Sequence, residues 1–100
     1  MQENTNEIVI NLKTPITQGE RTVTALILPK HVLLRHIIAG DAYPQGSVER
    51  EAAILSAMSG EPMMIIQNME ITDWITCQAK LNELISSSII DKKNDDSKKK

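Results

Sequence analysis

The chain contains no phenylalanine and only two aromatic side chains, Tyr43 and Trp74, among its 100 residues. Hydrophobic residues nevertheless make up 41% of the sequence, so the core must be built from aliphatic side chains and methionine. Proteins that bind single-stranded nucleic acid stack the bases on aromatic side chains. The scarcity of aromatic residues therefore argues against that class of protein.

Cysteine and long hydrophobic runs are also scarce. Cys77 is the single cysteine, which excludes an intramolecular disulfide and fits a reducing compartment. No run approaches the roughly 20 apolar residues that a transmembrane helix needs. The polar start MQENTNEI lacks the basic and apolar segments of a signal peptide. The sequence therefore predicts a soluble cytoplasmic protein without a membrane partner.

Basic charge is in short supply. The formal net charge is −2 and the pI is about 5.6, whereas DNA-binding domains usually carry a basic surface that displaces the counterions of the phosphates. A helix predicted after Ser47 has Arg50 alone between Glu49 and Glu51, which suits a recognition helix poorly. We expect no nucleic-acid partner, and a small DNA-binding or regulatory protein of a mobile element is the alternative interpretation.

Residues that could perform catalysis or bind a metal are poorly spaced for either task. His31 and His36 are five residues apart, whereas two ligands on one helical face need a spacing of three or four. Cys77 falls in an apolar helical stripe, which is typical of a small buried side chain. The four glycines each mark the end of an element and form no phosphate-binding loop. We therefore expect no catalytic residue, no metal site and no cofactor, and we do not expect an enzyme.

Hydrophobic periodicity predicts an α+β fold, with an N-terminal antiparallel β-hairpin followed by three to four short α-helices. Alternating apolar residues from Ile8 indicate a strand that ends at Thr14-Pro15, because proline cannot donate to a ladder. Gly19 provides the turn into a return strand. The hairpin is expected over residues 8–28. On the return strand, Val23 and Ile27 are expected on the face opposite Leu26.

The helices are expected between residues 30 and 88. Pro29 closes the second strand and opens a helix over residues 30–39. Ser47 is a suitable N-cap for the next helix, which Gly60 ends. The segment MMIIQNM predicts one or two helical turns.

The last helix is predicted to begin near Glu70 or Thr72 and to fray around residues 86–88. It carries an apolar stripe with helical spacing. The stripe consists of Ile71, Trp74, Ile75, Gln78, Leu81 and Ile85, widened by Cys77 and Leu84. Residues 1–7 are expected to be a flexible N-terminus, and residues 89–100 a disordered charged tail with nothing to bury.

Four of the five methionines and the single tryptophan are the candidate partner-binding residues. Methionine is flexible and polarisable, and it is frequent on surfaces that adapt to a partner. The alternative is that these side chains fill gaps in a core that lacks aromatic residues. Tryptophan can likewise belong to the core or form the centre of an interface. The candidates are Met58, Met63, Met64, Met69 and Trp74.

The stretch INLKTPITQGERTVTALILPK resembles the opening of the tail assembly chaperones of contractile-tailed phages, the E-protein family of Mu-like and P2-like viruses and their prophages. The shared features are Thr14-Pro15 after the first strand, Gly19-Glu20 in the turn and Pro29-Lys30 at the exit. The later segment MEITDWITCQAKLNELI is similar to the last helix of that family. The likeness covers residues 8–88. The chain departs from the family at KHVLLRH, where members often have an acidic helix start.

The resemblance implies a non-catalytic role. Such chaperones bind the long tape-measure protein, keep its apolar helical segments from aggregating and help the tail-tube protein to polymerise around it. The tape-measure protein is thus the expected partner and the tail-tube protein a second one, and association of several copies of the chain with one another stays open. The location implied is the cytoplasm of the bacterial host.

Overall fold

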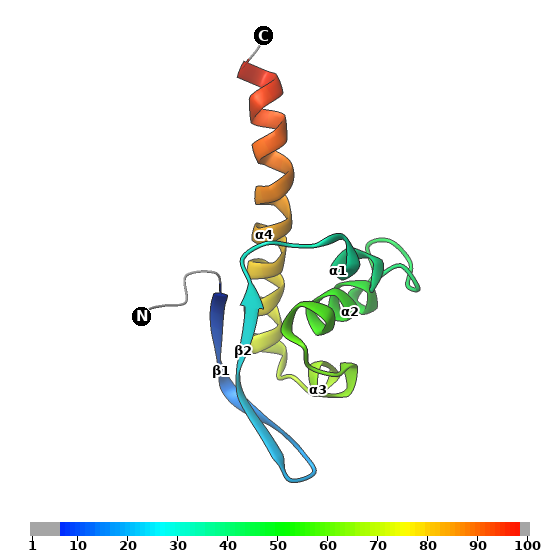
Figure 1. The fold of residues 1–100 in the computed structure, drawn as a ribbon. Coiled ribbons are helices and arrows are strands. Elements are labelled where there is room, and N and C mark those ends of the chain that lie inside the picture. Colours follow the sequence, from blue (N-terminus) through cyan, green and yellow to red (C-terminus); the bar gives the residue numbers. More distant parts are fainter. Residues whose placement is uncertain (1–6, 99–100) are drawn as a thin grey trace.

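The computed structural model describes the backbone of residues 7–98 and the side chains of residues 7–86. Within this range an antiparallel two-stranded hairpin is followed by four helices (Figure 1), so the predicted α+β class is confirmed. The elements are β1 (Glu7–Gln18), β2 (Arg21–Pro29), α1 (Leu34–Ile38), α2 (Val48–Ser59), α3 (Met63–Gln67) and α4 (Ile71–Lys98). The expected flexible segment 1–7 lies outside the described residues, except for Glu7, which begins β1.

β1 does not end at Thr14-Pro15, and that prediction is wrong. The strand continues to Gln18 through a change of register. Asn11 pairs with Ala25 and Ile16 with Val23, so residues 12–15 of β1 oppose Thr24 alone. Pro15 is tolerated because the residues of such a bulge do not pair across the ladder.

The bulge also changes which side chains of β2 are buried. Simple alternation places Val23 on the face opposite Leu26, yet both are buried, at 5% and 0% exposure. The spacing of three between them falls where β2 passes the bulge, and a bulge bends and twists the strands locally. Beyond it, alternation returns: the cross-strand pair Val9 and Ile27 is exposed on the outer face.

The first helix is shorter than predicted, because Pro29 is the last residue of β2 and α1 begins only at Leu34. Leu33 keeps an extended backbone, and its N–H donates to Nδ1 of His36 over 2.9 Å. This contact caps the helix at Leu33, so residues 30–33 form a connection. The limits of α2 are confirmed: Oγ of Ser47 accepts from the N–H of Arg50, and Gly60 ends the helix with a φ of 78°.

The core lies between the hairpin and the helices. α3 and α4 pack on β1, whereas α2 packs on β2 and contacts the other three helices (Figure 1). Burial of each large aliphatic side chain stabilises the fold by about 2 kcal/mol. The most deeply buried side chains are Leu26, Leu28, Leu55, Ile65, Cys77 and Leu81.

α4 is not short, and it does not fray near residues 86–88. Its backbone stays helical for 28 residues, up to Lys98, and its end extends past the other elements (Figure 1). The sequence contains no glycine or proline after Pro62, so nothing stops the helix. The disordered tail over 89–100 stays a prediction: the backbone is helical up to Lys98, and residues 99–100 lie outside the described part. Among the described helices, none is both long and apolar enough to cross a bilayer.

The buried stripe of α4 is rotated from the predicted one. Ile71 and Ile75 are 60% and 56% exposed, whereas Asp73 is only 3% exposed. The buried line runs through Asp73, Cys77 and Leu81 at a spacing of four. The sequence does not predict this rotation, because side-chain polarity alone indicates buried isoleucines and an exposed aspartate.

Candidate functional site

Three helices meet around a groove that we call the methionine groove. It lies between α2, α3 and the start of α4 and has a volume of about 380 Å³. Val48 and Ile71 at its edge are 58% and 60% exposed, while Trp74 is 9% exposed. The groove thus offers apolar surface to a partner. Its main apolar lining residues are Val48, Met63, Ile66, Met69, Ile71 and Trp74.

A second groove, the α1 groove, lies between α1, α2 and α4 and has a volume of about 700 Å³. Its apolar wall comes from the connection before α1 and from α1 itself, and Leu34 there is 74% exposed. Arg50 and Glu51 from α2 add polar groups. Both grooves therefore use α2 as a shared wall, with α4 on the other side.

Gln18 at the end of β1 holds α3 in place. Its amide donates from Nε2 to Sδ of Met64, and its Oε1 accepts from Nδ2 of Asn68 over 2.9 Å. These contacts connect the hairpin to both ends of α3. Met64 is consequently directed to the hairpin, away from the methionine groove.

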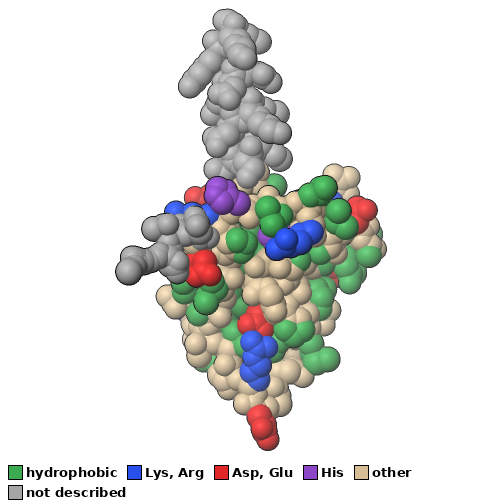
Figure 2. Space-filling view, in the orientation of Figure 1, with side chains coloured by type: hydrophobic (Ala, Val, Ile, Leu, Met, Phe, Trp, Pro, Cys, Tyr) green, Lys and Arg blue, Asp and Glu red, His purple; other side chains and the backbone are tan. Residues whose placement is uncertain are grey.

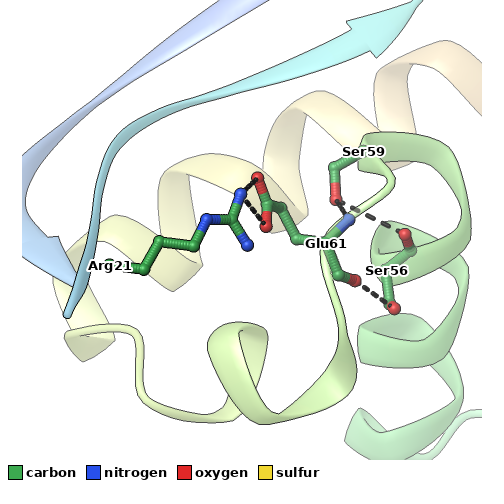
Figure 3. A network of polar contacts seen from close by, with 4 residues as sticks. All are labelled: Arg21, Ser56, Ser59 and Glu61. Atoms are coloured by element: carbon green, nitrogen blue, oxygen red, sulfur yellow. Dashed lines mark hydrogen bonds and ion pairs between the residues drawn. The ribbon is translucent and has the colours of Figure 1, made fainter. Parts of the chain in front are cut away.

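An ion pair fixes the segment between α2 and α3 (Figure 3). Nη2 of Arg21 lies 2.8 Å from each carboxylate oxygen of Glu61. Oγ of Ser59 accepts from the backbone N–H of Glu61 over 3.2 Å, and Oγ of Ser56 donates to its carbonyl. Because Glu61 is held through both side chain and backbone, α3 begins at a defined place and Met63 reaches the groove.

Asp73 fixes the start of α4 and with it the position of Trp74. Its carboxylate accepts the backbone N–H groups of Lys13 and Thr14, with N–O distances of 3.0 and 2.9 Å. These two hydrogen bonds hold the pKa of Asp73 below its usual value. The sequence showed Asp73 only as a first-turn residue. The signal that could have found it is its place four residues before Cys77, on the buried side of the helix.

The five predicted partner-binding residues do not share one surface. Met63, Met69 and Trp74 line the methionine groove. Met58 is 5% exposed and lies in the core, and Met64 is 56% exposed beside Gln18. The structure thus brings three of the five together, and their role in binding stays a prediction. Val48 and Ile71 were not among the predicted residues, because an exposed aliphatic side chain gives no signal in sequence.

Cys77 and His36 are shielded from solvent, whereas His31 is exposed. Burial, followed by the charge of Asp73, raises the pKa of the Cys77 thiol to about 11. Burial and then Arg35 lower the pKa of His36. Within the described part of the chain, no three His, Cys, Asp or Glu side chains gather to hold a metal ion. What the two grooves offer is apolar contact with a few polar groups at the edges.

The exposed apolar side chains agree with this description. Figure 2 shows hydrophobic side chains at several places over the side of the molecule that carries α1 to α3. The exposed ones on these helices and at the start of α4 include Leu34, Ile38, Val48, Met64 and Ile71. Compared with protein-family models, with curated proteins and with solved structures, the chain gives no match in any of the three.

Proposed function

We propose that this chain is a phage tail assembly chaperone that binds apolar helical segments of the tape-measure protein without catalysing a reaction. The observation that carries the proposal is the methionine groove, in which Met63, Met69 and Trp74 converge from two helices and the segment between them. The resemblance of the hairpin and of the last helix to the E-protein family supplies the identity of the partner. The groove supplies a physical means of binding it.

A groove of this kind accepts the side chains of one face of an amphipathic helix. Such helices present apolar residues at positions i, i+3, i+4 and i+7. Methionine side chains adapt to differently shaped partners, because their three rotatable bonds allow repacking. A chaperone that covers many different segments of one long protein needs this tolerance more than it needs tight binding at one site.

Repetition along the partner compensates for weak single contacts. A long helical tape-measure protein offers many apolar stripes, so a copy that leaves one stripe rebinds a neighbouring one. Weak binding also lets the chaperone leave when tail-tube subunits polymerise over the same surface.

The test is light scattering of the tape-measure protein encoded with this chain, purified in denaturant and diluted with or without the chaperone. We expect the wild-type chain to suppress aggregation and to be captured in a pull-down. Ile71→Gln removes an apolar side chain that lines the groove and should weaken both effects. Ile75→Gln is the matched control, because Ile75 is on the same helix and 56% exposed, yet does not line the groove.

Unchanged aggregation in the presence of the wild-type chain would remove the proposed function. Equal loss in the two isoleucine variants would move the binding surface from the groove to the exposed face of α4. Binding to duplex DNA that weakens with added salt would instead favour the regulatory alternative.

A further inference from the structure

Among the described residues that line the methionine groove, the one charged side chain is acidic. Glu49 lines the groove, and Glu70 lies between Met69 and Ile71, which both line it. Both glutamates are exposed. Among the described residues that line this groove, none is a lysine, an arginine or a histidine. An apolar surface with an acidic edge therefore faces the partner.

The nearest arginine on α2 does not compensate this charge. Arg50 follows Glu49 in the sequence, but its Nη1 donates to the carbonyl of Gly40 over 3.1 Å and lies 3.7 Å from Oδ1 of Asp41. Its side chain lines the α1 groove. The guanidinium is thus held on the other side of α2.

The carboxylate of Glu70 is kept ionised and oriented by its neighbour. Its Oε1 accepts from the hydroxyl and from the backbone N–H of Thr72, over 2.7 and 3.1 Å. These hydrogen bonds, the one from the hydroxyl first, lower the pKa of Glu70. The negative charge of Glu70 therefore persists to a lower pH than that of an ordinary glutamate.

Building on the proposed function, we propose that the helix bound in the methionine groove carries a lysine or arginine beside its apolar anchors, placed against Glu49 and Glu70. A cation there is attracted by both carboxylates, whereas an acidic residue at the same position is repelled by both. The charge selects among amphipathic helices of equal apolarity and speeds their encounter with the groove. In a long tape-measure protein, it marks the segments that the chaperone covers first.

Two synthetic amphipathic peptides of about 18 residues, long enough to form a helix on binding, test this inference. They share the same leucine anchors and lack tryptophan, and they differ only in having lysine or glutamate beside the anchors. Trp74 reports binding by its fluorescence, because it is the single tryptophan and lines the groove. We expect the lysine peptide to bind about tenfold more tightly at low salt, with the difference shrinking as salt is added.

Variants of the chain locate the effect. The double variant Glu49→Gln with Glu70→Gln should bring the two peptides to nearly equal affinity. The control double variant, Glu20→Gln with Asp41→Asn, removes the same amount of charge from exposed positions outside the groove lining and should preserve the preference. Equal affinity for both peptides in the wild type, or a preference that survives in the groove double variant, would overturn the inference.

The two proposals can fail separately. If the chain suppresses aggregation of the tape-measure protein but does not distinguish the peptides, the charge inference is wrong and the proposed function stands. If the lysine peptide binds with the expected preference while aggregation is unchanged, the groove recognises basic amphipathic helices and the tape-measure assignment is wrong.

Discussion

Asp73 at the start of α4 accepts hydrogen bonds from the backbone of Lys13 and Thr14 in the bulge of β1, 60 and 59 residues earlier in the chain. The bulge removes these two N–H groups from the ladder, and the partly buried hydrogen bonds to Asp73 supply acceptors in its place. The carboxylate also lies in the first turn of α4, where negative charge is favourable. One side chain thus joins the irregular part of the hairpin to the helix that carries Trp74.

Replacing Asp73 with asparagine should destabilise the fold. The amide keeps one acceptor oxygen but presents N–H groups to the second backbone donor, and the charge is lost. We expect a lower midpoint of urea unfolding, and faster hydrogen exchange at the amides of Lys13 and Thr14. Asp41→Asn is the control, because Asp41 forms only an exposed ion pair, and its loss should change the free energy of unfolding by about 0.5 kcal/mol or less. Unchanged exchange at both amides in the Asp73 variant would contradict this prediction.

The contribution of Asp73 should depend on pH in a defined direction. The backbone donors, that of Lys13 first, hold its pKa below the ordinary value of 3.8, so the unfolded chain takes up this proton at a higher pH than the folded chain. The stabilisation is therefore complete above about pH 5 and is lost as the pH falls through the lowered pKa. Urea unfolding of the wild type and of Asp73→Asn should differ most near neutral pH and converge at strongly acidic pH. A difference independent of pH would show that the charge does not matter.

The bulge shows where sequence reasoning ends. Alternation from Ile8 and the turn at Gly19 were enough to predict the hairpin, and Ser47 and Gly60 were enough to place α2, because these signals act over a few residues. The sequence alone predicts that the strand ends at Pro15, since a missing donor usually ends pairing. Asp73 supplies acceptors for the backbone N–H groups of Lys13 and Thr14, which precede Pro15. This contact joins residues 60 and 59 positions apart, and no local sequence pattern reveals it.

The candidate site was predictable only in part, for the same reason. The clustering of Met63 and Met69 and the presence of Trp74 suggested a binding surface, and these three do line one groove. Gln18 holds Met64 on the side of α3 that faces the hairpin, whereas Met58 of α2 is buried in the core. Both outcomes are set by tertiary contacts. The acidic edge was also missed, because Glu49 and Glu70 are 21 residues apart, and only the folded chain shows that Glu49 and the two neighbours of Glu70 line one groove.

His36 should make stability depend on pH in a higher range. Burial, followed by the charge of Arg35, lowers its pKa from 6.5, and the neutral Nδ1 accepts the N–H of Leu33. As the pH falls, the unfolded chain therefore protonates His36 at a higher pH than the folded chain does. The stability that is fully present above pH 6.5 is lost as the pH falls through the lowered pKa. His36→Gln should flatten thermal stability across this window, and Arg35→Gln should raise the pKa of His36 in an NMR titration. A pKa of 6.5 or above in the folded wild type would contradict the prediction.

Cys77 should resist thiol–disulfide exchange in the folded protein. With a pKa of about 11, only about one thiol in a thousand is ionised at pH 8, and the side chain is fully buried. Modification by a disulfide reagent should therefore follow unfolding, being slow in buffer and fast in urea. Rapid reaction under native conditions would show that α4 separates from the hairpin more readily than its contacts indicate.

Gly40 should be intolerant of even a methyl group, although its backbone does not require glycine. An added Cβ would lie 2.9 Å from Cγ of Arg50 and 3.0 Å from both the carbonyl oxygen of Arg50 and Cγ1 of Ile54. Two of these three atoms belong to the backbone and to the buried core, so α1 must move away from α2. We expect Gly40→Ala to cost about 1–3 kcal/mol of unfolding free energy in a urea titration.

The sign of the Gly40→Ala effect decides between packing and backbone entropy. An unstrained glycine-to-alanine change stabilises a protein by about 0.4–1 kcal/mol, because it restricts the unfolded chain. A stabilised variant would therefore show that α1 and α2 are packed less closely than described. Because Gly40 contacts the wall of the α1 groove and not the methionine groove, binding of the lysine peptide should survive the substitution. Loss of that binding would mean that the two grooves are coupled through α2.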